Sequence, residues 1–228
     1  MIESGHRWRV AIIDSGLDPA AGLPVLAQGR LDEEAGRIAQ QEAVDDASGH
    51  GTRVARVIAS ASRPPALLIA QVLDAKGRAT PAGVAAALRW ACDQDARIIH
   101  LSLGLSADRA VLSQAVSDAL RAGVLVVASA PARGAMSWPA RYPGVLSATG
   151  DARCAPDQIS ALGEQGAQFG GCVLRPPGMQ EPRGGASIGA AHVTRFIVSH
   201  VRPGSTPAQV RSDLVARASF HGRERRSG

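Results

Sequence analysis

The chain has 228 residues, of which 45% are hydrophobic, so it can bury one large core and we predict a single α/β domain over residues 1–228. Only 3% of the residues are aromatic, which argues against a surface on which nucleic-acid bases stack. The net charge of +5 owes much to a basic segment at about 219–228, which we expect to be a solvated, flexible tail rather than a nucleic-acid site.

Residues 1–7 contain no apolar stretch of signal-peptide length, and no later segment approaches the roughly 18 apolar residues that cross a membrane. We therefore expect a cytoplasmic protein without a membrane partner. Cys92, Cys154 and Cys172 are odd in number and lack CxxC spacing, which predicts reduced thiols and neither a disulfide framework nor a zinc site. Whether Cys154 and Cys172 form a disulfide is left undetermined.

Apolar runs rich in β-branched residues alternate along the chain with segments of helical periodicity. They predict strands at 8–13, 67–73, 97–102, 124–128 and 145–148. Helices are predicted after His50, after Thr80-Pro81, over 111–120, after Ser187 and after Thr206-Pro207. This alternation is typical of a mostly parallel sheet covered by helices on both faces.

Three short motifs contain an aspartate, a histidine and a serine in the chain order of one type of serine hydrolase: residues 14–16, 49–52 and 185–192. Asp14 closes the first predicted strand, whereas His50 and Ser187 open helical segments. In open α/β sheets these positions meet at one edge. Each motif alone would be an ordinary turn, a loop histidine or a small residue at a helix contact. Their joint order predicts a nucleophilic triad.

These motifs resemble those of the subtilisin-type (S8) serine peptidases, and the resemblance extends over nearly the whole chain, with support from residues 102–104 and 138–143. It implies a three-layer fold and acyl transfer without a cofactor. Ser187 would attack a peptide carbonyl, His50 would take its proton, and Asp14 would orient the imidazolium. The resemblance also implies two groups of substrate-binding residues: Leu101, Ser102, Leu103 and Gly104 as an added-strand site, and Ala128, Ser129 and Ala130 as a wall of the primary specificity pocket.

The chain departs from the family pattern at the oxyanion region. Ala132, after Pro131, stands where the family keeps an asparagine whose amide donates to the oxyanion. Loss of that amide in a subtilisin lowers turnover by about 10²–10³, so we expect slow chemistry. The backbone N–H of Ser187 remains as the expected donor, and whether a side chain such as Ser129 or Arg133 joins it stays open.

Two further departures concern processing and metals. The first predicted strand begins so early that we expect no amino-terminal chaperone segment, and the short connection 61–66 lacks carboxylates, so we expect no structural calcium. Asp45 and Asp46 are interpreted as solvated loop charges rather than as a metal pair. No metal site is predicted anywhere.

A slow, unsecreted peptidase suits the maturation of one precursor, and we expect a peptide or protein precursor as partner. In size and oxyanion region the chain resembles the small subtilisin-type peptidases that remove a leader from the small subunit of quinohemoprotein amine dehydrogenase. Two alternatives stay open: a catalytically silent fold that binds peptides or proteins, and an esterase or acyltransferase with the same triad. Cleavage preference and oligomeric state are left undetermined.

Overall fold

The computed structural model describes residues 7–34, 37–163, 165–174 and 184–224. They form alternating strands and helices. In chain order the elements are β1 (Arg9–Asp14), the 3-10 helix η1 (Pro19–Ala21), β2 (Val25–Glu34), β3 (Arg37–Gln41), α1 (His50–Ala59), β4 (Ala66–Gln71), α2 (Pro81–Asp93), β5 (Ile98–Leu101), α3 (Ala110–Arg121), β6 (Leu125–Ser129), β7 (Leu146–Gly150), β8 (Ile159–Ala161), β9 (Phe169–Gly171), α4 (Ala186–His200), α5 (Pro207–Arg217) and β10 (Phe220–His221).

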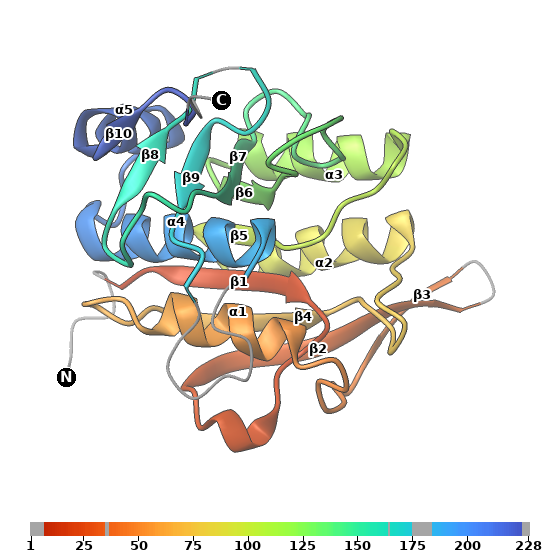
Figure 1. Ribbon diagram of the computed structural model, residues 1–228. Coiled ribbons are helices and arrows are strands. Elements are labelled where there is room, and N and C mark those ends of the chain that lie inside the picture. Colours follow the sequence, from red (N-terminus) through yellow and green to blue (C-terminus); the bar gives the residue numbers. More distant parts are fainter. Residues whose placement is uncertain (1–6, 35–36, 164, 175–183, 225–228) are drawn as a thin grey trace.

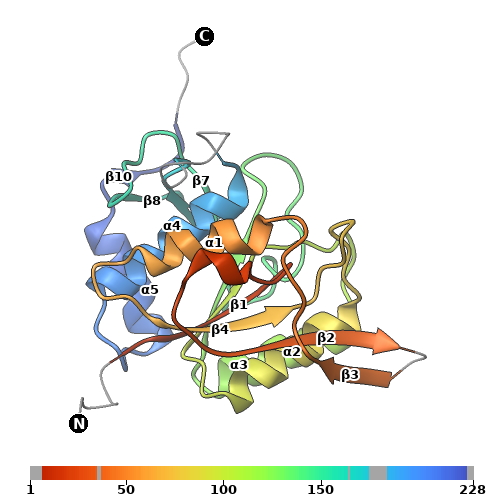
Figure 2. The same cartoon turned by 90° about the horizontal axis from the view of Figure 1, so that it is seen from below.

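The elements are arranged in three layers, as the sequence predicts. The strands form the middle layer, with α1, α4 and α5 on one face and α2 and α3 on the other (Figures 1 and 2). Within the described residues they make one ten-stranded sheet in the order β10-β8-β9-β7-β6-β5-β1-β4-β2-β3. Only β2 with β3 and β8 with β9 pair antiparallel in it. The carboxyl ends of the central parallel strands therefore meet at one edge.

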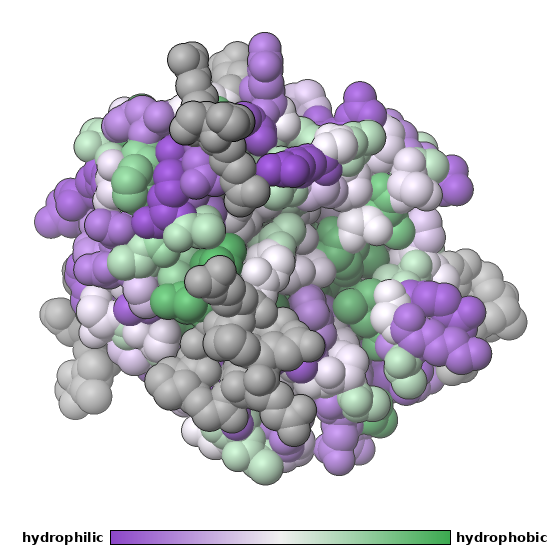
Figure 3. All heavy atoms as spheres, viewed as in Figure 1, coloured by the Kyte–Doolittle hydropathy of each residue, from purple (hydrophilic) through white to green (hydrophobic). Residues whose placement is uncertain are grey.

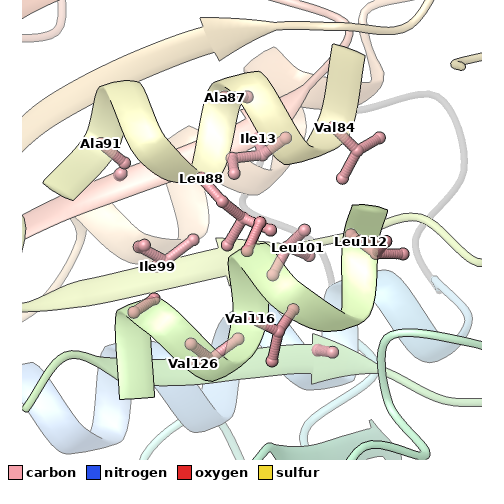
Figure 4. Close-up of a cluster of buried hydrophobic side chains, with 14 of the residues drawn as sticks. Ile13, Val84, Ala87, Leu88, Ala91, Ile99, Leu101, Leu112, Val116 and Val126 are labelled. Carbon is pink, nitrogen blue, oxygen red and sulfur yellow. The ribbon is translucent and has the colours of Figure 1, made fainter. Parts of the chain in front are cut away.

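Side chains of β1 alternate between two hydrophobic cores. Ala11 and Ile13 face the core beneath α2 and α3, whereas Val10 and Ile12 face the core beneath α1 and α4. Because both faces of the sheet are covered, β1 is a continuous apolar run instead of an alternating one. Figure 4 shows the first core, in which side chains of α2 and α3 meet those of the strands: Ile13, Val84, Ala87, Leu88, Ala91, Ile99, Leu101, Leu112, Val116 and Val126.

All five predicted strands and all five predicted helices are present, and the strand ends differ from the predicted ones by one or two residues. The predicted start of α5 is confirmed in detail, because Thr206 and Gln209 form a reciprocal capping box. In α3, Leu112, Ala115, Val116 and Ala119 are buried, whereas Val111 is 41% exposed. The outer strands β2, β3, β8, β9 and β10 were not predicted, because they are very short or contain polar residues.

The prediction of a flexible tail at 219–228 is wrong for its first part. β10 pairs in parallel with β8, and the Ser219 N–H donates to the Ile159 carbonyl oxygen at 2.9 Å. A two-residue strand carries too little periodicity to be recognised without its partner. Residues 225–228 lie outside the described part of the chain.

Candidate active site

Asp14 is the last residue of β1, lies at the carboxyl edge of the sheet and is only 1% exposed. Its Oδ1 atom accepts a hydrogen bond of 2.7 Å from the Ser15 N–H and lies 2.7 Å from Nδ1 of His50. Nε2 of His50 makes no hydrogen bond to the described residues and is free to exchange a proton. A buried carboxylate that orients an imidazole in this way is the arrangement of a general base.

His50 is the first residue of α1 and is half-buried. The helix starts close to the turn after β1, because Gly51 has no side chain: a Cβ there would lie 2.3 Å from the Gly16 carbonyl oxygen. The hydrogen bond with Asp14 raises the pKa of His50 above its ordinary 6.5, although burial opposes this change. Two segments that lie far apart in sequence are thus joined as the motif order predicts.

Ser187 lies in the first turn of α4, where backbone N–H groups have no partner within the helix. Its hydroxyl donates to the Ser102 carbonyl oxygen at 3.5 Å, and no hydrogen bond joins it to His50. His50 and Ser102 line the same cavity, and Asp14 and Ser187 each contact one of these two residues. Hydrogen bonds between catalytic groups are often long without substrate and tighten when it binds.

Asp46 is a site residue that the sequence analysis misinterpreted as a solvated charge. It is 8% exposed, and its carboxylate accepts hydrogen bonds from the Thr52 N–H and hydroxyl at 2.8 and 2.7 Å and from the Ser15 hydroxyl at 2.9 Å. A carboxylate that receives several hydrogen bonds can be buried. The nearby hydroxyl residues Ser48 and Thr52 were the available signal. Asp45 is exposed, as predicted.

His100 was assigned no role, yet it lies fully buried in β5 beside the site. Its ring nitrogens contact the Thr194 hydroxyl at 2.9 Å and the Ser102 hydroxyl at 2.8 Å. Burial lowers the pKa of His100 to about 3, so the ring is neutral. The imidazole therefore links α4 to the segment that carries the Ser102 carbonyl. An ionisable residue inside the apolar run of β5 was the signal in the sequence.

A cavity of about 600 Å³ extends from His50 along the residues that follow β5. Apolar side chains of Leu73, Ala79, Leu103 and Leu105 line it. Figure 3 shows a hollow with hydrophobic walls right of the centre of this face, over the segments that carry them. We call this cavity the groove; it is suited to an extended chain with apolar side chains.

The predicted substrate-binding residues divide into two sets. Ser102, Leu103 and Gly104 line the groove. The prediction is wrong for Leu101 and Ala128, because these residues pair with each other inside the sheet and their side chains pack in the core. Their backbones already have strand partners on both sides.

Ser129 and Ala130 are buried at the end of β6, and neither lines the groove. The assignment of Ser129 and Ala130 to a wall of the specificity pocket therefore remains a prediction. Ala132, in place of the family amide, lies in the exposed loop that follows β6. Nothing in its side chain can donate a hydrogen bond.

Cys92, Cys154 and Cys172 are free thiols, so no bond joins the pair that had been left open. Among the described residues, no group of three or more His, Cys, Asp or Glu side chains could hold a metal ion. Within that same part of the chain, none of the helices is both long and apolar enough to span a membrane.

The model of the subtilase family, Peptidase_S8, matches residues 5–228, and the chain therefore belongs to this family. Alkaline elastase YaB from Bacillus sp. (strain YaB) is 34% identical over 155 residues, which cover 63% of this chain and 39% of the elastase. The thermostable alkaline protease of Halalkalibacterium halodurans is 36% identical over 154 residues, covering 63% of this chain and 41% of the protease. The chain thus spans about two fifths of the length of these relatives.

A subtilisin from Bacillus pumilus is 27% identical over 246 aligned residues, covering 96% of this chain and 86% of the subtilisin. The solved structure of Sphericase superposes with a TM-score of 0.66 at 22% identity, over 94% of this chain and 84% of Sphericase. At that identity the superposition shows the fold alone, and it agrees with the three layers described above.

Proposed function

We propose that this chain is a serine endopeptidase in which Asp14, His50 and Ser187 form the catalytic triad. The observation that carries the proposal is the 2.7 Å contact between Asp14 and the His50 ring at the end of the groove. The names of the relatives, an elastase and an alkaline protease, support a peptide bond as the bond that is broken.

In this mechanism a peptide lies in the groove with its scissile carbonyl at Ser187. Ser187 Oγ forms a bond to the carbonyl carbon while Nε2 of His50 takes the hydroxyl proton. The protonated ring then gives that proton to the amine as the C–N bond breaks. Water releases the acyl group from Ser187 by the same route. Asp14 stabilises the imidazolium through the hydrogen bond that raises the pKa of His50.

The negative charge on the carbonyl oxygen would be stabilised by the Ser187 N–H and by the amino end of α4. The side chain of Ala132 adds no donor. We therefore propose a functional but slow peptidase, with turnover about 10²–10³ below that of a relative with an amide at this position.

An activity-based probe tests the triad. A fluorophosphonate should add one adduct to the wild-type chain, seen as an increase in intact mass, and none to Ser187→Ala. The matched control is Ser117→Ala, which removes an exposed hydroxyl of α3 that does not line the groove and should keep the adduct. A wild-type protein that stays unmodified while a control subtilisin reacts would contradict the proposal.

The finer proposal is that the substrate is a single precursor from which a leader is removed, such as the small subunit of quinohemoprotein amine dehydrogenase, in the cytoplasm. Slow chemistry and an apolar groove support a narrow substrate range, and the three free thiols support a reducing compartment. Co-expression with that precursor should yield a product whose mass locates one cleavage site. If the precursor stays intact in cells that express the wild-type chain, the proposal of this substrate is refuted.

A second candidate function is a peptide-binding module without catalysis. It is favoured by two observations: Ala132 offers no donor, and the Ser187 hydroxyl bonds to Ser102 rather than to His50. The two functions differ in what Ser187→Ala does. A binding module keeps its affinity for a peptide and shows no turnover in the wild type, whereas a peptidase loses turnover with the serine.

A further inference from the structure

The loop 130–138 lies beside the groove and is held at both ends. At its start the Ala130 N–H donates to the Ala148 carbonyl oxygen of β7 at 2.8 Å. At its end Trp138 and Leu105 exchange two backbone hydrogen bonds of 2.8 and 3.0 Å. Since Leu105 lines the groove, the end of this loop at Trp138 lies beside the groove.

The middle of the loop is held differently, by an arginine from the C-terminal segment. Residues 131–135 are exposed, and within the described chain their hydrogen-bond partner is Arg223. Nη1 of Arg223 donates to the Ala132 carbonyl oxygen at 3.3 Å, while Nη2 donates to the carbonyl oxygens of Gln165 and Ala167. One guanidinium therefore joins the loop to the neighbouring segment 165–168.

Arg223 is itself placed by a well-anchored backbone. The Gly222 N–H donates to the Ala161 carbonyl oxygen of β8 at 2.8 Å, and the Gly222 carbonyl accepts from Arg153 at 2.9 Å. The guanidinium of Arg153 also lies 5.1 Å from the ring centre of Phe220, and an ion pair with Asp151 fixes its position. The C-terminal segment is thus a rigid support for Arg223.

We propose that Arg223 is a positioning residue for the peptidase: it holds the backbone at Ala132, which stands at the oxyanion position of the family. This inference rests on the proposed activity. Because Ala132 has no side-chain donor, this position can contribute to the oxyanion site only through its backbone, so the placement of that backbone matters more here than in a relative with an amide. The C-terminal segment therefore completes the active site.

A guanidinium suits this task because its donors point in several fixed directions and can reach carbonyls on two segments at once. A lysine ammonium at this position reaches one of the segments at a time. Arg223→Lys should consequently retain part of the contribution that Arg223 makes to kcat, and Arg223→Ala should lose all of that contribution. Both substitutions lie on the surface and leave β10 intact.

The test compares the wild type, Arg223→Ala, Arg223→Lys and a chain ending at Glu224, which keeps Arg223 and serves as the matched control. For Arg223→Ala we expect kcat to fall roughly tenfold while KM changes less than about twofold, since small displacements of groups facing a transition state cost up to about 100-fold. Limited trypsin cleavage after Arg133, located by the masses of the fragments, should become faster. The control should match the wild type in both measurements.

Wild-type kcat and a wild-type rate of cleavage after Arg133 in Arg223→Ala would overturn the inference. A change in KM alone would also overturn it, because the loop would then serve substrate binding only. If the wild type reacts with neither probe nor peptide, the proposed function fails, and the catalytic part of this inference fails with it. The rate of cleavage after Arg133 still decides in that case whether Arg223 holds the loop.

Discussion

The Asp46 carboxylate accepts a hydrogen bond of 2.9 Å from the hydroxyl of Ser15, although the two residues are 31 positions apart in sequence. The same hydroxyl accepts the Gly51 N–H at 2.9 Å and contacts Asp14 Oδ1 at 3.1 Å. This junction joins the turn after β1 to the first turn of α1. It is therefore what brings Asp14 and His50 together.

Replacing Asp46 should destabilise the protein. Asp46→Ala leaves the Ser15 and Thr52 donors without their charged acceptor, and we expect the free energy of unfolding to fall by about 2–4 kcal/mol. Urea unfolding at pH 7 measures this. Asp45→Ala is the matched control, because the neighbouring carboxylate is exposed, and it should change the value by less than about 0.5 kcal/mol. Equal effects of the two substitutions would show that the hydrogen bonds of Asp46 do not stabilise the fold.

The stabilisation by Asp46 should depend on pH. Burial opposes ionisation of Asp46, but hydrogen bonds from Thr52, Ser15 and Ser48 outweigh it and lower its pKa below 3.8. A carboxyl whose pKa is lowered by folding contributes fully above its unfolded pKa and loses that contribution as pH falls through the folded value. The stability difference between wild type and Asp46→Asn should thus shrink below pH ~4. A constant difference down to pH 2 would contradict this.

The activity of the peptidase should rise with pH through the titration of His50. Only the neutral ring can take the Ser187 proton, and the hydrogen bond with Asp14 raises the pKa of His50 above 6.5. The acid limb of kcat/KM should therefore have its midpoint above 6.5. In Asp14→Asn the midpoint should move down and the rate should fall by about 10⁴. A wild-type midpoint below 6.5 would show that Asp14 does not control this ring.

His100 should make the protein sensitive to acid. Burial lowers its pKa to about 3, so between pH 6.5 and 3 the unfolded chain binds a proton that the folded protein does not. Stability is then lost as pH falls, by at most about 1.4 kcal/mol per pH unit. Unfolding free energies measured between pH 6.5 and 4.5 should fall less steeply in His100→Asn than in the wild type. Parallel slopes would show that His100 does not contribute.

The contact of α4 with β7 should not tolerate an added methyl group at Gly189. A Cβ there would lie 2.2 Å from the Thr149 carbonyl oxygen, so Gly189→Ala must push the amino end of α4, with Ser187, away from the sheet. We expect a loss of about 2 kcal/mol in stability and of probe labelling. Ser117→Ala, at an exposed position of α3, is the control and should keep both. Normal labelling of Gly189→Ala would show that α4 can shift without harm.

Much of the fold could be predicted because its signals are local. The apolar run that forms β1, the threonine and proline that start α2 and α5, and the glycine before His50 each act through neighbours in sequence. The predicted tail failed for the opposite reason. Phe220 and His221 form a strand only because β8 lies beside them, and no pattern within two residues shows that partner.

The sequence by itself determined the layered sheet and the order of Asp14, His50 and Ser187, because backbone periodicity and turn chemistry depend on adjacent residues. Only the tertiary structure decided that Asp46 is buried, that His100 links α4 to Ser102, and that Arg223 reaches Ala132. These contacts join segments that are distant along the chain. Which donor meets which acceptor is set by how the helices and loops pack against the sheet, and packing is a property of the whole fold.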